Sequence, residues 1–444
     1  MTRTTPRVAQ ASMTPAASSA GSATPASLQV VIVGQGYVGL PLAMRAVDVG
    51  HRVVGFDTDQ ERVKRLAKGD SYIEDVSSPK LADALNSGRY LPTDSMSEAA
   101  GFDVAVITVP TPLRDGAPDL SFVEAAAGTV GRCLRPGACV VLESTTYPGT
   151  TTELVGPILQ VASGLVPGAD FHLGYSPERI DPGNQHWGLA NTPKVVSGID
   201  QASLEVVRAF YDTMVERTIT VSGTGEAEMV KLVENTFRHV NIALANELAT
   251  FASDLGVDIW EALDAAATKP FGFMRFNPGP GVGGHCLPID PSYLSWQAKR
   301  RTGSTFRFVE LANDVNEHMP EYVVRRLMLG LNRCGKALNG SRVLLLGLAY
   351  KPNTSDARES PALAIAKRLL ALGARVHAAD PHVSEDLPCG RINRVELTDV
   401  ELEKADAVVV VTDHDTFDYD MVAARASYVL DTRRRLRGEL VEHL

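Results

Sequence analysis

The sequence lacks the signatures of several large classes of protein. Its five cysteines are odd in number, widely spaced and without a CxxC pair, so neither a disulfide framework nor a zinc site is indicated, and a reducing cytoplasm fits best. No stretch approaches the ~20 apolar residues that span a bilayer, and no apolar secretory core is present. The formal net charge of -10 argues against a broad nucleic-acid surface, which needs a basic face. We therefore expect a soluble protein that binds neither membranes nor nucleic acids.

What is present is the composition of an ordinary globular protein, with 44% hydrophobic and 22% charged residues,. At 444 residues the chain is too long for one hydrophobic core, so two or three domains are expected. Residues 1–27 consist mainly of Ser, Thr, Ala and Pro, with Arg3 and Arg7 but no acid. This composition cannot bury apolar surface, which predicts a disordered tail.

Two parts of the chain carry the pattern of an α/β fold. Residues 28–221 contain continuous apolar runs such as QVVIVG, DVAVITV and ACVVLE, as expected of strands buried on both faces, with helical segments between them. A looser copy begins at about residue 341 with SRVLLLG, followed by ARVHAAD and ADAVVVVTD. The loop after its first strand lacks GxGxxG, so no second dinucleotide site is predicted.

Residues 222–255 are predicted to form one long helix, which Ser222 or Thr224 could cap and Gly256 would end,. Its apolar residues occupy more than one stripe, which is typical of helices packed against other helices or a second subunit. We therefore predict a central helical domain at 222–319 that makes a homodimer or larger homo-oligomer. The predicted fold class is α/β, with two Rossmann-like, doubly wound parallel-sheet domains, 28–221 and 320–444, joined by this central helical domain.

A dinucleotide-binding pattern follows the first predicted strand. Gly34, Gly36 and Gly39 spell GxGxxG at the start of a helix, and Asp57 ends the next strand. The glycines allow a tight turn and a close approach of backbone N–H groups to a pyrophosphate, while the acid can bind a ribose 2'-hydroxyl. Because an acid repels a 2'-phosphate, NAD is favoured over NADP. The alternative, a glycine turn made only for packing, does not explain why strand, helix and acid occur together.

A second candidate site is the segment FNPGPGVGGHCLPIDP, residues 276–291. Glycine lets a backbone approach a ligand and proline fixes the shape of the loop, so Cys286 is presented rather than simply buried. The alternative is a small core hydrophobe, which is our interpretation of the other four cysteines. As a thiolate, Cys286 could capture an aldehyde as a thiohemiacetal for oxidation to a thioester. Asp290 could activate water, or it could only cap the next helix.

Lys231 and Asn235 lie four residues apart on the long predicted helix and therefore project from the same face,. A lysine can stabilise a developing alkoxide, and an asparagine can donate to the same oxygen or to a bound water. The alternative is a solvated lysine whose stem covers an apolar stripe.

Taken together, these residues resemble the UDP-glucose and GDP-mannose dehydrogenase family. The resemblance extends from residue 28 to the end through several motifs, which are GQGYVGLPLA, VPTP, ESTTYPGTT, YSPERIDPGN, KLVENTFRHVNIALANEL, PGPGVGGHCLPIDP, GLAYKPNTSDARESP and VLDTR. It implies an NAD-binding first domain, a central dimer domain and a last domain that binds the nucleotide of the sugar. The implied reaction is a double oxidation at C6 of a nucleotide sugar that consumes two NAD.

The resemblance also implies roles for individual residues. The implied catalytic residues are Cys286, Lys231, Asn235, Asp290, Glu178 and Thr145. The implied cofactor contacts are Gly34, Gly36, Tyr37, Val38, Gly39, Asp57, Arg62, Pro110, Thr111, Thr145 and Arg358. The implied substrate contacts are Glu178, Arg179, Lys231, Asn235, Phe276, Gly283, Tyr350, Lys351 and Arg433. No metal ligand is implied.

The sequence departs from parts of the family, and these departures bear on the sugar. Ile289 stands where enzymes specific for UDP-glucose usually carry a lysine, and the second glutamate that some of them have after SPER is missing. Both departures favour the UDP-N-acetylhexosamine branch. Arg275 and Asn277 differ from the proline and tyrosine expected in that branch, so UDP-glucose or TDP-glucose remains open.

Two other functions are compatible with parts of the pattern. A 3-hydroxyacid-type dehydrogenase would share the dinucleotide site and a helical Lys and Asn pair but would transfer one hydride and need no nucleophilic cysteine. A non-catalytic sensor would bind NAD and a sugar nucleotide without turnover. A uronic acid product would serve a capsule polysaccharide, a cell-wall glycan or a glycosylated antibiotic or other secondary metabolite.

Overall fold

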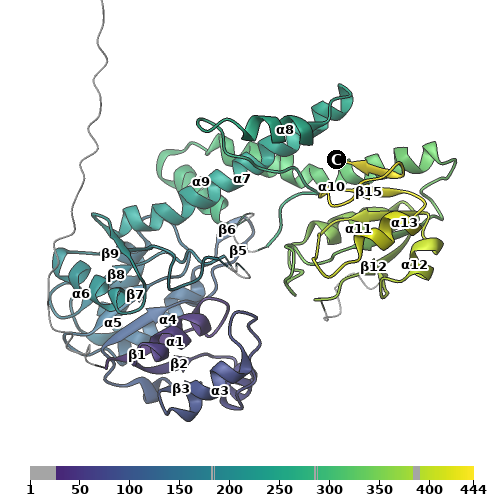
Figure 1. Ribbon diagram of the computed structural model, residues 1–444. Coiled ribbons are helices and arrows are strands. Elements are labelled where there is room, and N and C mark those ends of the chain that lie inside the picture. The colour runs from purple at the N-terminus through teal and green to yellow at the C-terminus, as the bar shows by residue number, and fades with distance from the viewer. Residues whose placement is uncertain (1–26, 182–183, 185, 285–286, 288, 384–390) are drawn as a thin grey trace, which may run out of the picture.

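The computed structural model describes residues 27–181, 184, 186–284, 287, 289–383 and 391–444 of the chain. All but Ser27 of the predicted tail lies outside the described residues. The fold is α/β, as predicted, with two sheet domains joined by long helices (Figure 1). No helix in the described ranges is both long and apolar enough to cross a membrane.

The first sheet has eight strands in the order β10-β9-β8-β7-β4-β1-β2-β3. Its strands are β1 (Gln29–Val33), β2 (Arg52–Phe56), β3 (Tyr90–Thr93), β4 (Val104–Ile107), β7 (Cys139–Leu142), β8 (His172–Tyr175), β9 (Lys194–Gly198) and β10 (Thr218–Thr220). The apolar runs at β1, β4 and β7 are buried, as predicted for strands covered on both faces,. The sheet is parallel, as predicted, except that β8 and β9 pair antiparallel, so the chain reverses direction at that edge.

Helices cover both faces of this sheet. On one face the core includes side chains of α1 (Gly39–Asp48), α2 (Gln60–Ala67), α3 (Ser78–Asn86) and α6 (Gln201–Asp212). On the other face it includes α4 (Ser121–Arg132), η2 (Thr151–Val155) and α5 (Gly156–Ser163). The short helix η1 (Met96–Ala99) also packs there, and β5 (Leu113–Arg114) and β6 (Ala117–Pro118) form a separate hairpin. The arrangement is doubly wound.

The second sheet has six strands in the order β13-β12-β11-β14-β15-β16, and each described pair is parallel. Its strands are β11 (Arg342–Leu346), β12 (Arg375–Ala379), β13 (Asn393–Arg394), β14 (Ala407–Val410), β15 (Val429–Asp431) and β16 (Val441–His443). Helix α11 (Pro361–Ala371) shares a core with one face. Helices α12 (Asp399–Lys404) and α13 (Tyr419–Arg425) share a core with the other.

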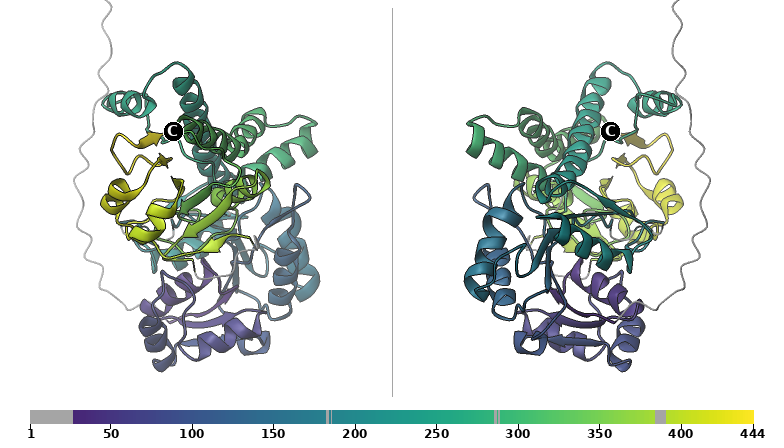
Figure 2. Two further views of the ribbon diagram at one scale, coloured as in Figure 1. Left: turned by 90° about the vertical axis from the view of Figure 1, so that its right-hand side faces the viewer. Right: turned by 90° about the vertical axis from the view of Figure 1, so that its left-hand side faces the viewer.

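Four helices connect the two sheets: α7 (Thr224–Asp254), α8 (Ile259–Ala267), α9 (Asp290–Thr302) and α10 (Arg307–Arg333). Figure 2 shows them above the sheets from two sides. The long helix was predicted, and Gly256 follows it with a φ of 69°,. Its cap was predicted wrongly, because Gly223 is the N-cap residue and provides no side chain to cap the helix.

Helix α10 continues past residue 319 into the second sheet domain, where its side chains join the core of α11. A buried polar network ties α7 to α10. His239 Nε2 lies 2.7 Å from Asn313 Oδ1, and Asn246 Nδ2 donates to Asn316 Oδ1 at 2.9 Å. Because buried polar groups need partners, this network fixes the relative position of the two helices.

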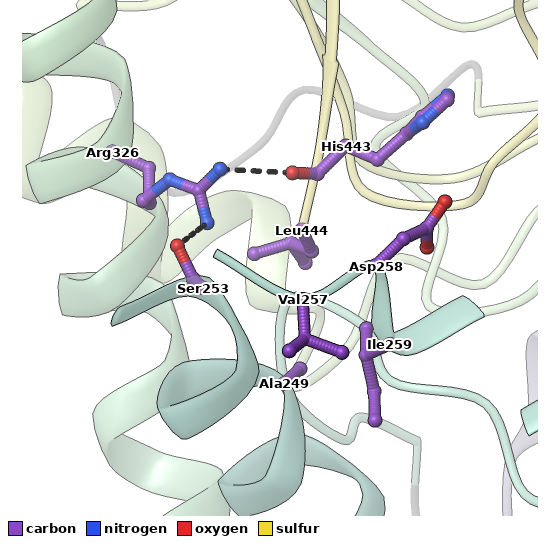
Figure 3. Close-up of a pocket in the computed structure, with 8 residues that line it drawn as sticks. All are labelled: Ala249, Ser253, Val257, Asp258, Ile259, Arg326, His443 and Leu444. Atoms are coloured by element: carbon purple, nitrogen blue, oxygen red, sulfur yellow. Dashed lines mark hydrogen bonds between the residues drawn. The ribbon is translucent and has the colours of Figure 1, made fainter. Parts of the chain in front are cut away.

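A pocket of about 200 Å³ lies at a second contact between the connecting helices and the second sheet domain (Figure 3). Its lining residues are Ala249, Ser253, Val257, Asp258, Ile259, Arg326, His443 and Leu444. The Arg326 guanidinium donates to Ser253 Oγ, to the His443 carbonyl and to Glu442. Its donors thus join α7, α10 and the last strand. None of the predicted site residues lines this pocket.

The prediction that four cysteines are core residues is only partly right. Cys139 is buried and Cys133 is half-buried, but Cys334 is exposed. Cys334 follows the last residue of α10 as its C-cap, where the chain turns at the surface. Cys389 lies outside the described residues.

Candidate active site

The glycine turn after β1 has two crowded glycines and one open one. Gly34 has a φ of 93°, and a Cβ there would lie 2.8 Å from the Thr108 carbonyl oxygen. A Cβ on Gly39 would lie 1.8 Å from the Gly34 carbonyl oxygen. No described atom lies within 4 Å of a Cβ built on Gly36. Gly34 and Gly39 are therefore needed for the turn itself, and Gly36 leaves room for a ligand.

Asp57 lies just beyond β2 and supports this turn. Its carboxylate accepts hydrogen bonds from the Gln35 N–H at 2.8 Å and the Asp59 N–H at 2.9 Å. Arg62 Nη1 lies 3.7 Å from the same carboxylate, and its side chain is about half exposed. Tyr37 and Val38 complete the turn, and α1 begins directly after it at Gly39, so the positive N-terminal end of this helix lies at the turn,. The residues therefore fit a dinucleotide.

The sequence did not predict the side chains that support the turn. The Gln35 side chain is fully buried, and its Nε2 donates to the Ile32 carbonyl at 2.9 Å. Tyr90 donates its hydroxyl to Gln35 Oε1 at 2.7 Å, and Tyr72 donates to the Gln35 carbonyl at 2.6 Å. A polar residue inside the motif was the only signal, because both tyrosines are distant in sequence.

The two other predicted cofactor loops are held against each other. Ser144 Oγ donates to the Val109 carbonyl at 2.8 Å, which joins the loop of Thr145 to the VPTP loop of Pro110 and Thr111. Tyr293 of α9 donates its hydroxyl to the Thr111 carbonyl at 2.6 Å. The structure thus brings Thr111 and Thr145 to the carboxyl ends of the adjacent strands β4 and β7, where α/β sheets bind ligands.

Four of the predicted catalytic residues form two pairs between α7, α9 and the loop after β8. Lys231 Nζ donates to the Glu178 carbonyl at 2.5 Å and lies 3.7 Å from Glu178 Oε2. Asn235 Nδ2 donates to Asp290 Oδ2 at 2.6 Å. All four side chains are buried. Lys231 is thus not the solvated lysine of the alternative interpretation.

Asp290 is the first residue of α9, but it does not cap that helix. The N-cap position belongs to Ile289, and no side-chain cap is formed. The pKa of Asp290 is raised to about 6, because burial, together with the nearby charge of Glu178, outweighs the lowering by Lys231 and by the hydrogen bond from Asn235,. A carboxyl group with this pKa can exchange protons near neutral pH, as a general acid or base requires.

Cys286 lies outside the described residues, as do His285 and Pro288. The residues on either side of this segment are described. Gly284 packs closely on the Tyr350 ring, since a Cβ at this glycine would lie 2.7 Å from a ring carbon, and Asp290 is held by Asn235.

The rest of the glycine segment packs against the second sheet domain. A Cβ on Gly283 would lie 2.6 Å from the Glu359 carbonyl oxygen, and one on Gly279 would lie 2.8 Å from Arg433 Nη1. Burial lowers the pKa of Arg433, and its Nε donates to the Val411 carbonyl at 2.8 Å. The structure therefore brings Gly283, Tyr350 and Arg433 together along one side of this segment.

Other predicted substrate contacts are engaged by protein groups. Arg179 binds Glu234 at 2.6 Å and also donates to the Pro193 carbonyl. Lys351 reaches from the second sheet domain to Asp181, at 2.5 Å. Phe276 packs edge-on against Phe237, with ring centroids 5.6 Å apart. A substrate contact from Arg179 or Lys351 therefore competes with an existing ion pair.

The loop before α11 also reaches the dinucleotide turn. The Arg358 guanidinium lies over the Tyr37 ring, 5.6 Å from its centroid, and forms two hydrogen bonds to Asp356. The Ser355 N–H donates to Glu74 Oε1 at 2.9 Å. Tyr37 and Arg358, two cofactor contacts implied by the resemblance, thus meet where the two sheet domains contact each other. No described group of His, Cys, Asp and Glu side chains is arranged to hold a metal ion.

Comparison with known proteins matches three family models along the chain. Residues 28–215 match the NAD-binding domain of the UDP-glucose/GDP-mannose dehydrogenase family, residues 225–318 match its central domain, and residues 344–438 match its UDP-binding domain. The matches follow one another in the same order as the first sheet, the connecting helices and the second sheet.

Relatives and solved structures agree with these matches. The chain is 37% identical over 391 residues to a UDP-N-acetyl-D-mannosamine dehydrogenase of Pyrococcus horikoshii, covering 88% of this chain and 90% of the relative. It is 38% identical over 363 residues to a UDP-N-acetyl-D-glucosamine 6-dehydrogenase of Pseudomonas aeruginosa, covering 81% and 84%. The solved structure of a UDP-glucose dehydrogenase from Pyrobaculum islandicum has a TM-score of 0.84 at 32% identity, covering 94% of this chain and 96% of that one.

Proposed function

The chain belongs to the UDP-glucose/GDP-mannose dehydrogenase family, and from this premise we propose that it oxidises C6 of a nucleotide hexose to the uronic acid in two steps. The observation that carries the proposal is the pairing of Lys231 with Glu178 and of Asn235 with Asp290 beside the cysteine segment. An enzyme that transfers a single hydride has no need of a nucleophilic cysteine.

The family's first domain binds NAD, and the residues around Gly36 fit this cofactor. NAD supplies the acceptor for the hydride that leaves C6. The turn from Gly34 to Gly39 and the N-terminus of α1 would hold its pyrophosphate, and Asp57 would bind a ribose hydroxyl. Arg358, stacked over Tyr37, would close the site from the other domain.

In the first oxidation, C6 loses a hydride and its hydroxyl loses a proton, giving an aldehyde. Lys231 stabilises the developing alkoxide, since its buried ammonium is held in place by Glu178,. Asn235 donates to the same oxygen or to a water. Glu178 lies 3.7 Å from Lys231 Nζ and Asp290 accepts a hydrogen bond from Asn235, so either carboxylate is placed to take the proton that the hydroxyl loses,.

In the second oxidation, the Cys286 thiolate adds to the aldehyde carbon to form a thiohemiacetal. Loss of a second hydride from that carbon gives a thioester, and attack by water releases the carboxylate and regenerates the thiol. Asp290 assists this attack, because its pKa of about 6 leaves it mostly ionised at pH 7 and able to accept a proton from water. Thr145, in the loop after β7, would hold this water in place by a hydrogen bond.

For the substrate, we propose a UDP-N-acetylhexosamine, with UDP-glucose or TDP-glucose as the alternative. Ile289 in place of a lysine favours the first, and so do the names of the two relatives. Arg275 is held by Asp264 and by Asn277 Oδ1, and both Arg275 and Asn277 differ from that branch. A panel of UDP-GlcNAc, UDP-ManNAc, UDP-glucose, TDP-glucose and GDP-mannose, followed by NADH absorbance, would identify the sugar.

The two-step reaction is tested by counting NADH. Limiting substrate should yield two NADH per sugar, and Cys286→Ser should stop after the first oxidation or release only traces of acid. A yield of one NADH per sugar would favour the 3-hydroxyacid-type reaction. Binding of both ligands with no turnover on the whole panel would favour a non-catalytic sensor.

We also propose that the protein is a homodimer through an apolar stripe on α7. Six exposed side chains share one face of this helix at helical spacing, and these are Val233, Phe237, Leu244, Leu248, Phe251 and Leu255,. A stripe of this length is typical of an interface between copies rather than of free surface. Sedimentation equilibrium should give twice 47.6 kDa, and Leu248→Glu with Phe251→Glu should give the monomer. A monomeric unaltered protein would disprove this interface.

A further inference from the structure

Glu228 is a buried acid in the candidate site that neither the sequence analysis nor the proposed chemistry uses. Its side chain is fully buried on α7. One carboxylate oxygen accepts the Gly149 N–H at 2.6 Å, and the other accepts the Thr151 N–H at 2.8 Å and the Thr151 hydroxyl at 2.6 Å. Helix η2 begins at Thr151, and its own N-cap residue, Thr150, makes no side-chain cap. Glu228 therefore caps a helix of the first sheet domain from the central domain.

The position of Glu228 on α7 relates this cap to the reactive groups. Glu228, Lys231 and Asn235 are spaced i, i+3 and i+7, so their side chains lie along one face of the helix,. All three are buried. Any shift of α7 relative to η2 therefore moves Lys231 and Asn235 by a similar amount.

The turn that Glu228 binds follows directly after Thr145. Thr146 Oγ1 donates to Thr150 Oγ1 at 2.5 Å within the turn. On the other side of Thr145, Ser144 donates to the Val109 carbonyl. Thr145 thus lies between Ser144 and Thr146, both of which form hydrogen bonds. The bond of Thr146 is made within the turn that Glu228 binds.

From this geometry we propose that Glu228 is a positioning residue for the proposed oxidation, on which this inference rests. Its carboxylate fixes the separation between Thr145 on the first sheet domain and the Lys231 and Asn235 pair on α7. Reacting groups must be held to well within 1 Å, and an error of that size can cost about a hundredfold in rate.

The chemistry of the three donors requires an ionised carboxylate. The pKa of Glu228 is raised to about 7, because burial, together with nearby Glu153, outweighs the lowering by the hydrogen bonds from Thr151 and Gly149. Among the described residues its hydrogen-bond partners are uncharged. An amide in its place would keep one acceptor oxygen for Thr151 but turn an N–H donor towards the Gly149 N–H, which leaves both donors unsatisfied.

The test compares Glu228→Gln with Glu205→Gln, which makes the same change at an exposed carboxylate on α6. Assays run at pH 8.5, where Glu228 is ionised. Glu228→Gln should lower kcat tenfold or more while the KM values for NAD and for the sugar nucleotide change less than threefold. Thr151→Val, which removes only the hydroxyl donor, should lower kcat about threefold. Glu205→Gln should leave kcat unchanged.

A second measurement does not depend on activity. Hydrogen exchange of the peptide covering residues 146–155 should become at least tenfold faster in Glu228→Gln, because the Gly149 and Thr151 N–H groups lose their acceptor. Unchanged exchange would overturn the proposal even if the protein oxidised no sugar on the panel. Faster exchange with an unchanged kcat, or a loss that appears in KM alone, would also overturn it. If the unaltered protein shows no turnover, the proposed function is wrong, whereas the exchange rates still show whether Glu228 holds the turn at residues 149–151.

Discussion

The first turns of the two sheet domains start alike and are used differently. Gly34 has a φ of 93° and donates to the Phe56 carbonyl at 2.8 Å, and Gly347 has a φ of 86° and donates to the Ala379 carbonyl at 2.9 Å. A Cβ on either glycine would collide with a carbonyl oxygen at the end of a neighbouring strand, of Thr108 or of Thr412. The backbone at the start of the turn is therefore the same.

The difference begins two residues later. Gly36 is open, whereas the Ala349 N–H donates to Asp380 at 3.0 Å and its carbonyl accepts from Thr412 at 2.6 Å. Helix α1 begins at Gly39, but α11 begins only at Pro361. In both turns an N–H is given to a buried acid, from Gln35 to Asp57 and from Leu348 to Asp380, but the second turn also binds the Ala349 N–H internally, whereas Gly36 keeps an open side.

The turn after the first strand of a sheet domain thus has two uses in this molecule. Where the helix follows at once, its N-terminus lies at the turn, where an anion is favoured,. Where the helix is delayed, the intervening loop becomes long enough to cross to the other domain. That loop carries Lys351 to Asp181 and Arg358 to Tyr37. A missing GxGxxG thus marks a different role for the same edge of the sheet.

Asp380 is the residue whose loss should change the second turn most, because it binds the N–H groups of that turn. Its carboxylate is fully buried and accepts the Leu348 N–H at 2.6 Å and His414 Nε2 at 2.9 Å. Burial raises the pKa of Asp380, but these hydrogen bonds outweigh it and hold the pKa well below its usual range. Asp380→Asn should lower the stability of the second sheet domain by about 3 kcal/mol, measured by calorimetry at pH 7.

The contribution of Asp380 to the free energy of unfolding should depend on pH, which gives a second measurement. Because the folded pKa of Asp380 is lowered, its stabilisation is complete above pH ~4 and is lost as the pH falls further,. The unaltered protein and Asp380→Asn should therefore converge in stability in acid. Equal stability at pH 7 would show that Asp380 does not seal the turn.

Gly36→Ala tests the open side of the first turn. A Cβ there meets no described atom, so folding should be unaffected, but the methyl group would keep a pyrophosphate from approaching the backbone. We expect the KM for NAD to rise about thirtyfold, or ~2 kcal/mol, with an unchanged Tm. Gly128→Ala on α4, where the new atom also has room, is the control, and an equal effect there would refute the assignment.

Asp57→Asn should weaken the choice of cofactor. Its carboxylate lies at the same place in the first domain as Asp380 in the second, but it faces the open turn and Arg62. Loss of the charge should lower the preference for NAD over NADP about tenfold, measured as the ratio of the two kcat/KM values. An unaltered protein that uses both cofactors equally would contradict this role.

The smallest expected effect concerns the buried Asp290, whose pKa is raised, whereas the pKa of Asp380 is lowered. Because burial raises the pKa of Asp290 to about 6 and the ionised form accepts a proton, kcat/KM should be about fourfold lower at pH 5.5 than at pH 7.5. A profile that is flat across this range would remove Asp290 from the proton transfer.

The sequence predicted the parts of the molecule that depend on local pattern. The strands with continuous apolar runs, the long helix ending at Gly256 and the turn from Gly34 to Gly39 all follow from spacing and residue type. The i, i+4 spacing of Lys231 and Asn235 also placed them correctly on one face.

The remainder depends on contacts between distant segments. Nothing local to Gln35 indicates that Tyr72 and Tyr90 bind it, and nothing near Glu228 indicates the turn at Gly149. The reversal at β9 is decided by how the strand returns to the sheet edge, which hydropathy does not encode. The exposure of Cys334 follows from the place where α10 ends.

Helix α10 has a mechanical consequence for the whole protein. Its 27 residues make a rod about 40 Å long, which packs on α7 at one end and enters the core of the second sheet domain at the other. Because this one helix packs on α7 and also forms part of the core of the second sheet domain, a bend or roll of α10 would change the angle between the two sheet domains. A single residue inserted into α10 would turn the second domain by about 100° and carry Arg358 away from Tyr37.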